Sequence, residues 1–171
     1  MSKESRMLSV PEVAGEKQVI YLDFDGESTS YLGEIMELAN VKVEASGLTD
    51  ERIEALVAEL NSAVADRNVI FVTKKPESGE FSTVLVGNCD DLSAFGNFSG
   101  LSETIDKGNQ NRTDKAFVLL DASSSDAMLA EVILHETAHL LGADHGMNGD
   151  LSSYAWNPTG QITGGTLKNG E

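Results

Sequence analysis

Three histidines, the only ones in the chain, lie within eleven residues near its carboxyl end. His135 and His139 belong to residues 128–141, where apolar side chains recur nearly all round a helix. This pattern is typical of a helix buried inside a packed domain. Gly142 follows and suits the left-handed turn that ends many helices. Because residues four apart share one helix face, both imidazoles are expected to reach the same point.

The spacing of these residues predicts a metal site. His135, Glu136 and His139 form the pattern H-E-x-x-H, and a chain reversal at Gly142 brings His145 back as a third nitrogen ligand. Three neutral imidazoles with an open coordination position describe a catalytic Zn²⁺ site. Glu136 is offset from the ligands, so it can act as the general base on an acidified water. The expected reaction is amide hydrolysis.

The segment HETAHLLGADH, residues 135–145, resembles the extended signature H-E-x-x-H-x-x-G-x-x-H of the metzincin metallopeptidases. The resemblance covers residues 17–158 and implies a zinc-dependent endopeptidase that acts on proteins or peptides. It also implies an α+β fold, with a twisted mixed β-sheet packed against an amphipathic helix and an active-site helix. A small irregular carboxyl-terminal part completes the expected fold, and among the branches this part looks most like that of the matrixins.

Some positions depart from the matrixin pattern. Metzincins carry a methionine turn after the third histidine, which in matrixins is a Met-Tyr pair. Here Ser153 and Tyr154 stand at a comparable distance, and Met147 lies close behind His145. Tyr154 has two interpretations, as a group that stabilises an oxyanion or as a packed aromatic side chain. None of these departures removes a ligand or the base.

Two other functions stay open on the sequence. The missing methionine and the Gly-rich end of the chain suit a surface adhesion or binding module that retains zinc with little turnover. A zinc amidase acting on peptidoglycan is the other alternative. For the endopeptidase we expect an extracellular or cell-surface location and a monomer, although the start of this chain lacks the pattern of a signal peptide.

Charge and cysteine content narrow the partners and cofactors. Twelve basic residues stand against 28 acidic ones, a formal net charge of −16. Such a chain repels nucleic acids and anionic lipid surfaces. No apolar run approaches the roughly 20 residues of a membrane helix. Cys89 is the single cysteine, so a cysteine-based zinc site is excluded, and we expect Cys89 to be buried.

Two acidic segments are candidates for structural Ca²⁺. Asp23 and Asp25 lie two apart at the end of an expected strand, and residues 106–114 carry oxygen-bearing side chains at alternating positions around Gly108. Matrixins commonly bind calcium, so the resemblance implies the same here. The alternatives are solvated strand-end acids and a turn network of Asn and Gly.

The remaining pattern predicts the order of elements and domains. An amphipathic helix is expected from a cap at Thr49 or Asp50 to residue 67. Strands are expected at 69–73 and 81–86, so residues 69–87 would form a hairpin or two adjacent strands. Residues 27–48 are ambiguous, with a short helical turn suggested at 35–38 and a short strand at Val41 and Val43. Further strands are expected at 17–24, 116–120 and, as an edge strand over the cleft, 100–105. We expect a loose lead-in over 1–16, the catalytic domain over 17–158 and a Gly-rich tail over 159–171 that begins a repeat region.

Overall fold

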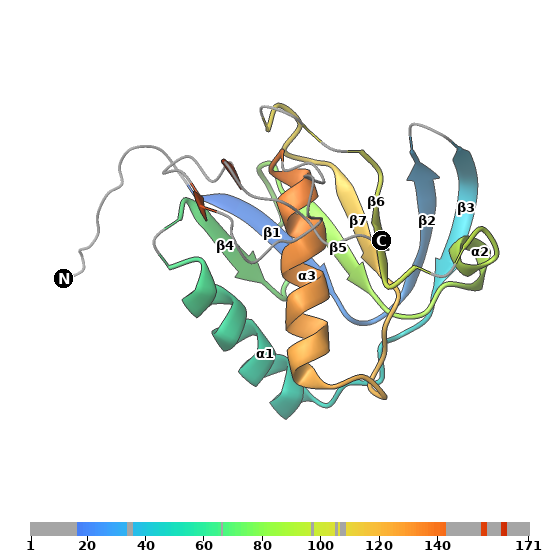
Figure 1. Cartoon of the computed structure of the whole chain (residues 1–171), viewed down its shortest axis with the longest axis horizontal. Helices are drawn as coiled ribbons and strands as arrows, with labels where there is room; N and C mark the ends of the chain where they lie inside the picture. The colour runs from blue at the N-terminus through green and yellow to red at the C-terminus, as the bar shows by residue number, and fades with distance from the viewer. Residues whose placement is uncertain are drawn as a thin grey trace.

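A five-stranded sheet forms the centre of the chain (Figure 1). The computed structural model describes residues 17–33, 36–65, 67–96, 98–104, 106 and 109–142, and the backbone of 155–156 and 162–163. The strand order is β4-β1-β5-β7-β6. Four strands are parallel: β1 (Gln18–Asp23), β4 (Val69–Val72), β5 (Ser82–Val86) and β7 (Lys115–Val118). Strand β6 (Gly100–Ser102) is antiparallel to β7, so the sheet is mixed and the predicted α+β class is confirmed.

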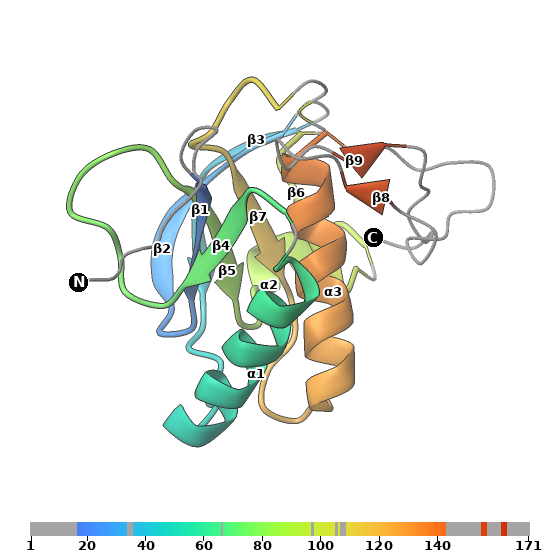
Figure 2. The ribbon, with the colours of Figure 1, turned by 90° about the vertical axis from the view of Figure 1, so that its left-hand side faces the viewer.

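Two helices, α1 (Asp50–Ala63) and α3 (Asp126–Leu140), cover one face of this sheet (Figure 2). Helix α1 begins at the predicted cap, where the Thr49 hydroxyl accepts a hydrogen bond from the amide of Arg52 at 3.2 Å. Leu56 and Leu60 of α1 are buried in a core that also contains side chains of α3 and of the parallel strands. Burial of apolar side chains from both layers holds the helices against the sheet.

The opposite face carries a second core. The hairpin of β2 (Glu27–Leu32) and β3 (Glu37–Val43), with α2 (Asp90–Ser93), packs there against alternate strand residues such as Phe117. Figure 2 shows the hairpin and the two long helices on opposite sides of the sheet. The Lys115 ammonium group donates hydrogen bonds to Ser30 O at 2.7 Å and to Thr29 Oγ1 at 3.0 Å. These contacts fix the hairpin on the sheet.

Two local predictions are wrong. Strands β4 and β5 are neither a hairpin nor neighbours, because β1 lies between them and pairs with both in parallel. Two parallel strands must be joined by a connection that crosses over to the other end of the sheet. Turn residues such as Pro76 and Gly79 occur in such connections as well as in hairpins, so they did not distinguish the two. Leu38, expected in a helical turn, lies in β3, where it pairs with Tyr31 of β2. The short strand expected at Val41 and Val43 is confirmed, because both residues belong to β3.

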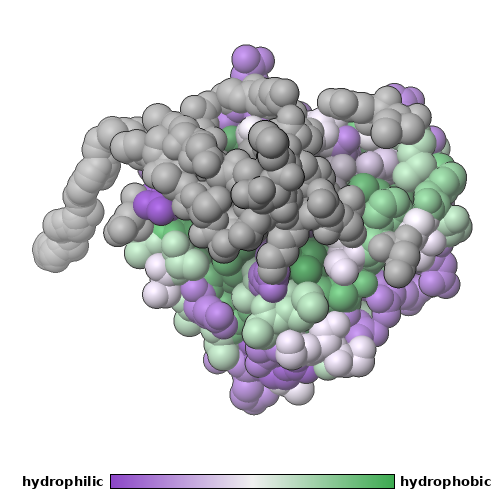
Figure 3. Space-filling view, in the orientation of Figure 1, coloured by the Kyte–Doolittle hydropathy of each residue, from purple (hydrophilic) through white to green (hydrophobic). Residues whose placement is uncertain are grey.

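The short strands β8 (Ala155–Trp156) and β9 (Ile162–Thr163) pair in antiparallel fashion across the predicted domain boundary at residue 158. In the described part of the chain, every helix is too short or too polar to cross a lipid bilayer. Apolar surface shows green in the space-filling view where α2 and the hairpin lie (Figure 3). Leu32, the last residue of β2, and Phe95, shortly after α2, are both exposed large apolar residues.

Candidate metal centre

Helix α3 carries the predicted site and is fixed at both ends. At the start of α3, the Ser125 hydroxyl oxygen accepts a hydrogen bond from the backbone amide of Met128 at 3.1 Å. The Arg52 guanidinium of α1 binds the Asp126 carboxylate at 2.6 Å and reaches the carbonyl of Ser124 at 2.9 Å. At the other end Gly142 has φ of +109°, and its amide donates to His139 O at 3.0 Å. The predicted glycine terminator is therefore confirmed.

The two helical histidines lie side by side. The ring centroids of His135 and His139 are 5.2 Å apart and their planes cross at 82°. Two imidazoles bound to one tetrahedral zinc at about 2.0–2.1 Å place their centroids about 5 Å apart. Both residues are buried, with 5% of His135 and 1% of His139 exposed.

The third predicted ligand, His145, lies outside the described residues, as do Met147, Ser153 and Tyr154. Within the described ranges no group of three or more His, Cys, Asp or Glu side chains is placed to hold a metal. The assignment of His145 to the zinc site therefore stays a prediction.

Glu136 lies between the helix and the edge of the sheet. Its side chain is fully buried and packs against the backbone of Gly100 in β6. A β-carbon at position 100 would lie 2.6 Å from Glu136 Oε2 and 2.8 Å from its Cγ. The proposed base thus lies against the expected edge strand.

Strand β6 is confirmed as an edge strand over Gly100–Ser102, and among the described strands only β7 pairs with it. The amide of Leu119 donates to Ser99 O, and that of Glu103 donates to Lys115 O. In an antiparallel pair this alternation turns the amides and carbonyls of Gly100 and Ser102 away from β7. The buried hydroxyl of Tyr31, from β2, donates to the Ser102 carbonyl at 3.2 Å.

The candidate calcium segment 106–114 connects to the helix end. The amide of Asp106 donates to His139 O at 3.1 Å. The Asp106 carboxylate accepts amides of Gln110 at 3.0 Å and Asn111 at 2.7 Å. These bonds form the turn network that the sequence offered as the alternative, and calcium binding in this segment stays a prediction.

Asp114, at the end of that segment, is a buried acid. Its Oδ1 accepts the Ser82 hydroxyl at 2.5 Å, and its side chain is 4% exposed. Burial raises the pKa of Asp114 to about 7, against the lowering effect of the Ser82 hydrogen bond. Asn109, with φ of 51°, donates a hydrogen bond to Gln18 Oε1 at 2.5 Å. Gln18, Ser82, Asn109 and Asp114 are all buried, and they lie near the start of the parallel strands.

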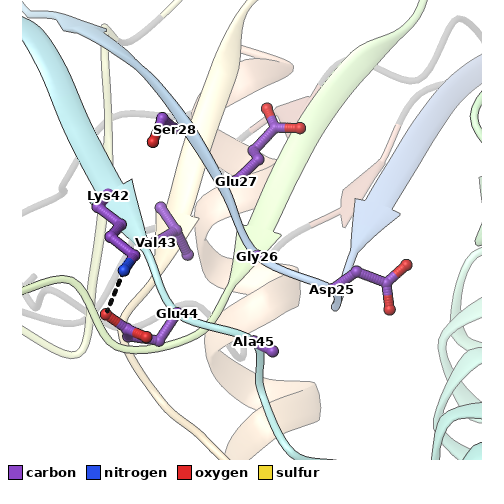
Figure 4. A pocket seen from close by; sticks show the side chains of 8 residues that line it. All are labelled: Asp25, Gly26, Glu27, Ser28, Lys42, Val43, Glu44 and Ala45. Atoms are coloured by element: carbon purple, nitrogen blue, oxygen red, sulfur yellow. Dashed lines mark ion pairs between the residues drawn. The ribbon is translucent and has the colours of Figure 1, made fainter.

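The other acidic candidates lie at the far end of β1. Asp23 Oδ1 accepts the amide of Asp25 at 3.0 Å. Burial and a hydrogen bond with Asp23 raise the pKa of the Glu27 carboxyl. A pocket of about 290 Å³ opens beside them. Two of its lining residues, Lys42 and Glu44, are close in sequence and form an ion pair with an N–O distance of 3.9 Å (Figure 4). No α3 residue lines this pocket, so it is distinct from the histidine pair.

Cys89 is fully buried in the hairpin-side core, as predicted, and burial raises the pKa of its thiol. Sequence reasoning placed Gly100 in the expected edge strand and Asp114 in the candidate calcium segment, but it did not predict the contact of Gly100 with Glu136 or of Asp114 with Ser82. A glycine inside a strand is a signal of close backbone approach, and it could have identified Gly100. No local pattern predicted that the Asp114 carboxyl would be buried against Ser82.

Comparison of the chain with protein-family models, curated proteins and solved structures finds no match.

Proposed function

We propose that the protein is a zinc-dependent endopeptidase of metzincin type. The observation that carries the proposal is the His135–His139 pair, whose 5.2 Å spacing suits one tetrahedral ion. Glu136 lies between them in sequence and is buried in the same helix half. A buried carboxylate beside two ligands of one ion has the arrangement that metal-assisted hydrolysis needs. His145 would complete the ligand set.

The fold supports this proposal in a second way. The chain has the kinds of element that the resemblance implies: a mixed sheet, the amphipathic helix α1 and the helix α3 that carries the histidine pair. Strand β6 lies next to α3 and turns the amide and carbonyl of Gly100 away from the sheet. An extended peptide added to such an edge would pass the Glu136 carboxylate.

Each residue then has a role in peptide hydrolysis. His135, His139 and His145 would hold the metal through neutral imidazoles. Zinc, when bound, supplies Lewis-acid polarisation of the scissile carbonyl and acidifies water. Glu136 accepts the proton of the attacking water and passes it to the leaving amine. Strand β6 aligns the extended substrate, so the scissile bond lies beside the base.

The proposed substrate is a protein or peptide, as the metzincin resemblance implies. The net charge of −16 disfavours nucleic acid as a partner. We place the enzyme outside the cell or on its surface, as a monomer. Calcium serves as a structural ion in this proposal.

The proposal is tested by replacing Glu136 with glutamine, which keeps the shape and removes the basic carboxylate. Cleavage of an unstructured protein by the Glu136→Gln variant should fall about a thousandfold or more, with bound zinc unchanged. Glu54→Gln, on the exposed side of α1, is the matched control and should cleave normally. A wild-type protein that carries zinc but cleaves no member of a broad peptide library would overturn the proposal in favour of a binding module. Digestion of peptidoglycan alone would also overturn it.

A further inference from the structure

Gly100 is a glycine whose backbone conformation does not require one. Its φ lies outside the left-handed region, so an L-residue could adopt it. What excludes a side chain is Glu136: a β-carbon at position 100 would lie 2.6 Å from Oε2, 2.8 Å from Cγ and 2.9 Å from Cδ. All three distances are shorter than a van der Waals contact. The Glu136 carboxylate therefore occupies space that a β-carbon at position 100 would fill.

The strand cannot easily move to admit a β-carbon. Hydrogen bonds to β7 hold β6 on both sides of Gly100, from Leu119 N to Ser99 O at 2.8 Å and from Glu103 N to Lys115 O at 3.1 Å. The Tyr31 hydroxyl holds the Ser102 carbonyl from the hairpin side. A displacement of β6 would break several of these bonds together.

The helix is equally constrained. Leu129 and Ile133 are fully buried in the core beneath α3, and Arg52 ties its first turn to α1. The side chain of Glu136 is then the element that yields. Because one of the close atoms is Cγ, rotation of the carboxylate alone does not relieve the contact, and the whole side chain must leave its place.

We propose that Gly100 is a positioning residue for Glu136: the bare backbone of β6 fixes where this carboxylate lies. The inference deepens the proposed function and rests on it for the role of Glu136 as the base. The contact itself is independent of metal and of activity. Position 100 must stay glycine for the base to remain beside the edge that carries the substrate.

A double-mutant cycle on stability tests the contact in the full chain. Gly100→Ala should raise the unfolding equilibrium constant roughly 10- to 100-fold through overcrowding. The same substitution in a Glu136→Ala background should raise it less than about threefold, since the opposing atoms are gone. In a Glu136→Gln background, which keeps the shape, the full effect should return. Equal effects of Gly100→Ala in all three backgrounds would overturn the inference.

Folding of the variants gives a further test. If Gly100→Ala does not fold, the Gly100→Ala/Glu136→Ala double variant should fold, because the crowding is relieved. Failure of both would show that position 100 needs glycine for another reason and would overturn the inference.

The kinetic test separates the inference from the proposed function. Folded Gly100→Ala at saturating zinc should lose about a hundredfold in kcat, with KM changed less than about twofold and bound zinc unchanged. An unchanged kcat would overturn the positioning role. Coupling in the stability cycle without any cleavage by the wild type would support the Gly100–Glu136 contact and refute the endopeptidase.

Discussion

Both halves of helix α3 are buried, but they carry different kinds of side chain. The first half presents Leu129, Val132 and Ile133 to the apolar core. The second half buries His135, Glu136, Thr137 and His139, with side-chain exposures of 5% or less. Apolar burial stabilises a fold, whereas burial of polar and ionisable groups costs free energy unless each is matched. The difference indicates that the first half holds the helix in place, and it agrees with the catalytic role that we propose for the second half.

The largest effect on stability is expected in the first half. Ile133→Ala should lower the free energy of unfolding by about 2–5 kcal/mol, because it removes fully buried methylene groups and leaves a cavity. Urea denaturation measures the change. Folded Ile133→Ala should still bind zinc, since Ile133 contributes packing only. A loss below about 1 kcal/mol would contradict the division between the halves.

A buried acid outside the helix tests whether polar burial is costly elsewhere. The pKa of Asp114 is about 7 in the fold, above its ordinary value of 3.8. The folded state therefore favours the protonated carboxyl. As a result, the contribution of this carboxyl to the free energy of unfolding is highest below pH 4 and falls as the pH rises to about 7. The loss amounts to about 4 kcal/mol for this shift.

Asp114→Asn should abolish that loss, so the variant is more stable than the wild type at pH 8 and similar at pH 4. Unfolding curves at several pH values measure the effect. Asp121 is a control of opposite sign, because hydrogen bonds from Ser123 lower the pKa of its carboxyl. Asp121→Asn should weaken the fold at neutral pH. Parallel pH profiles for the wild type and Asp114→Asn would refute the assignment.

The smallest effect is expected from Thr137, in the second half of α3. Its hydroxyl is fully buried and has no hydrogen-bond partner within the described residues. Thr137→Val replaces the hydroxyl with a methyl group of similar shape and should raise the free energy of unfolding by about 1 kcal/mol. Thr137→Ala, which also loses packing, is the comparison variant. Destabilisation by valine would mean that the hydroxyl makes a bond that supports the fold.

Sequence patterning was sufficient wherever a segment buries one continuous apolar surface. Helices α1 and α3 and strands β1, β4, β5 and β7 lie within a few residues of their predicted ranges. The strand at Val41 and Val43 was predicted, but the hairpin of β2 and β3 was not, because Tyr31 is the only buried residue of β2 and gives that strand no repeating pattern. The error over β4 and β5 arose because strand neighbours depend on long-range pairing, which turn residues do not determine.

The candidate site divides in the same way. The shared face of His135 and His139 follows from helical spacing, so the sequence predicted it. The contact between Gly100 and Glu136 depends on how β6 packs on α3, and the residues are 36 positions apart. Asp114 and Ser82 are likewise brought together by the register of β5 and β7. Contacts of this kind follow from the tertiary fold and not from local pattern.

The zinc content of the purified chain tests the central claim most directly. Elemental analysis of the wild type should find one zinc per chain, and His139→Ala should bind essentially none while remaining folded. A wild type that takes up no zinc, or a His139→Ala variant that holds it as firmly as the wild type, would contradict the metal centre.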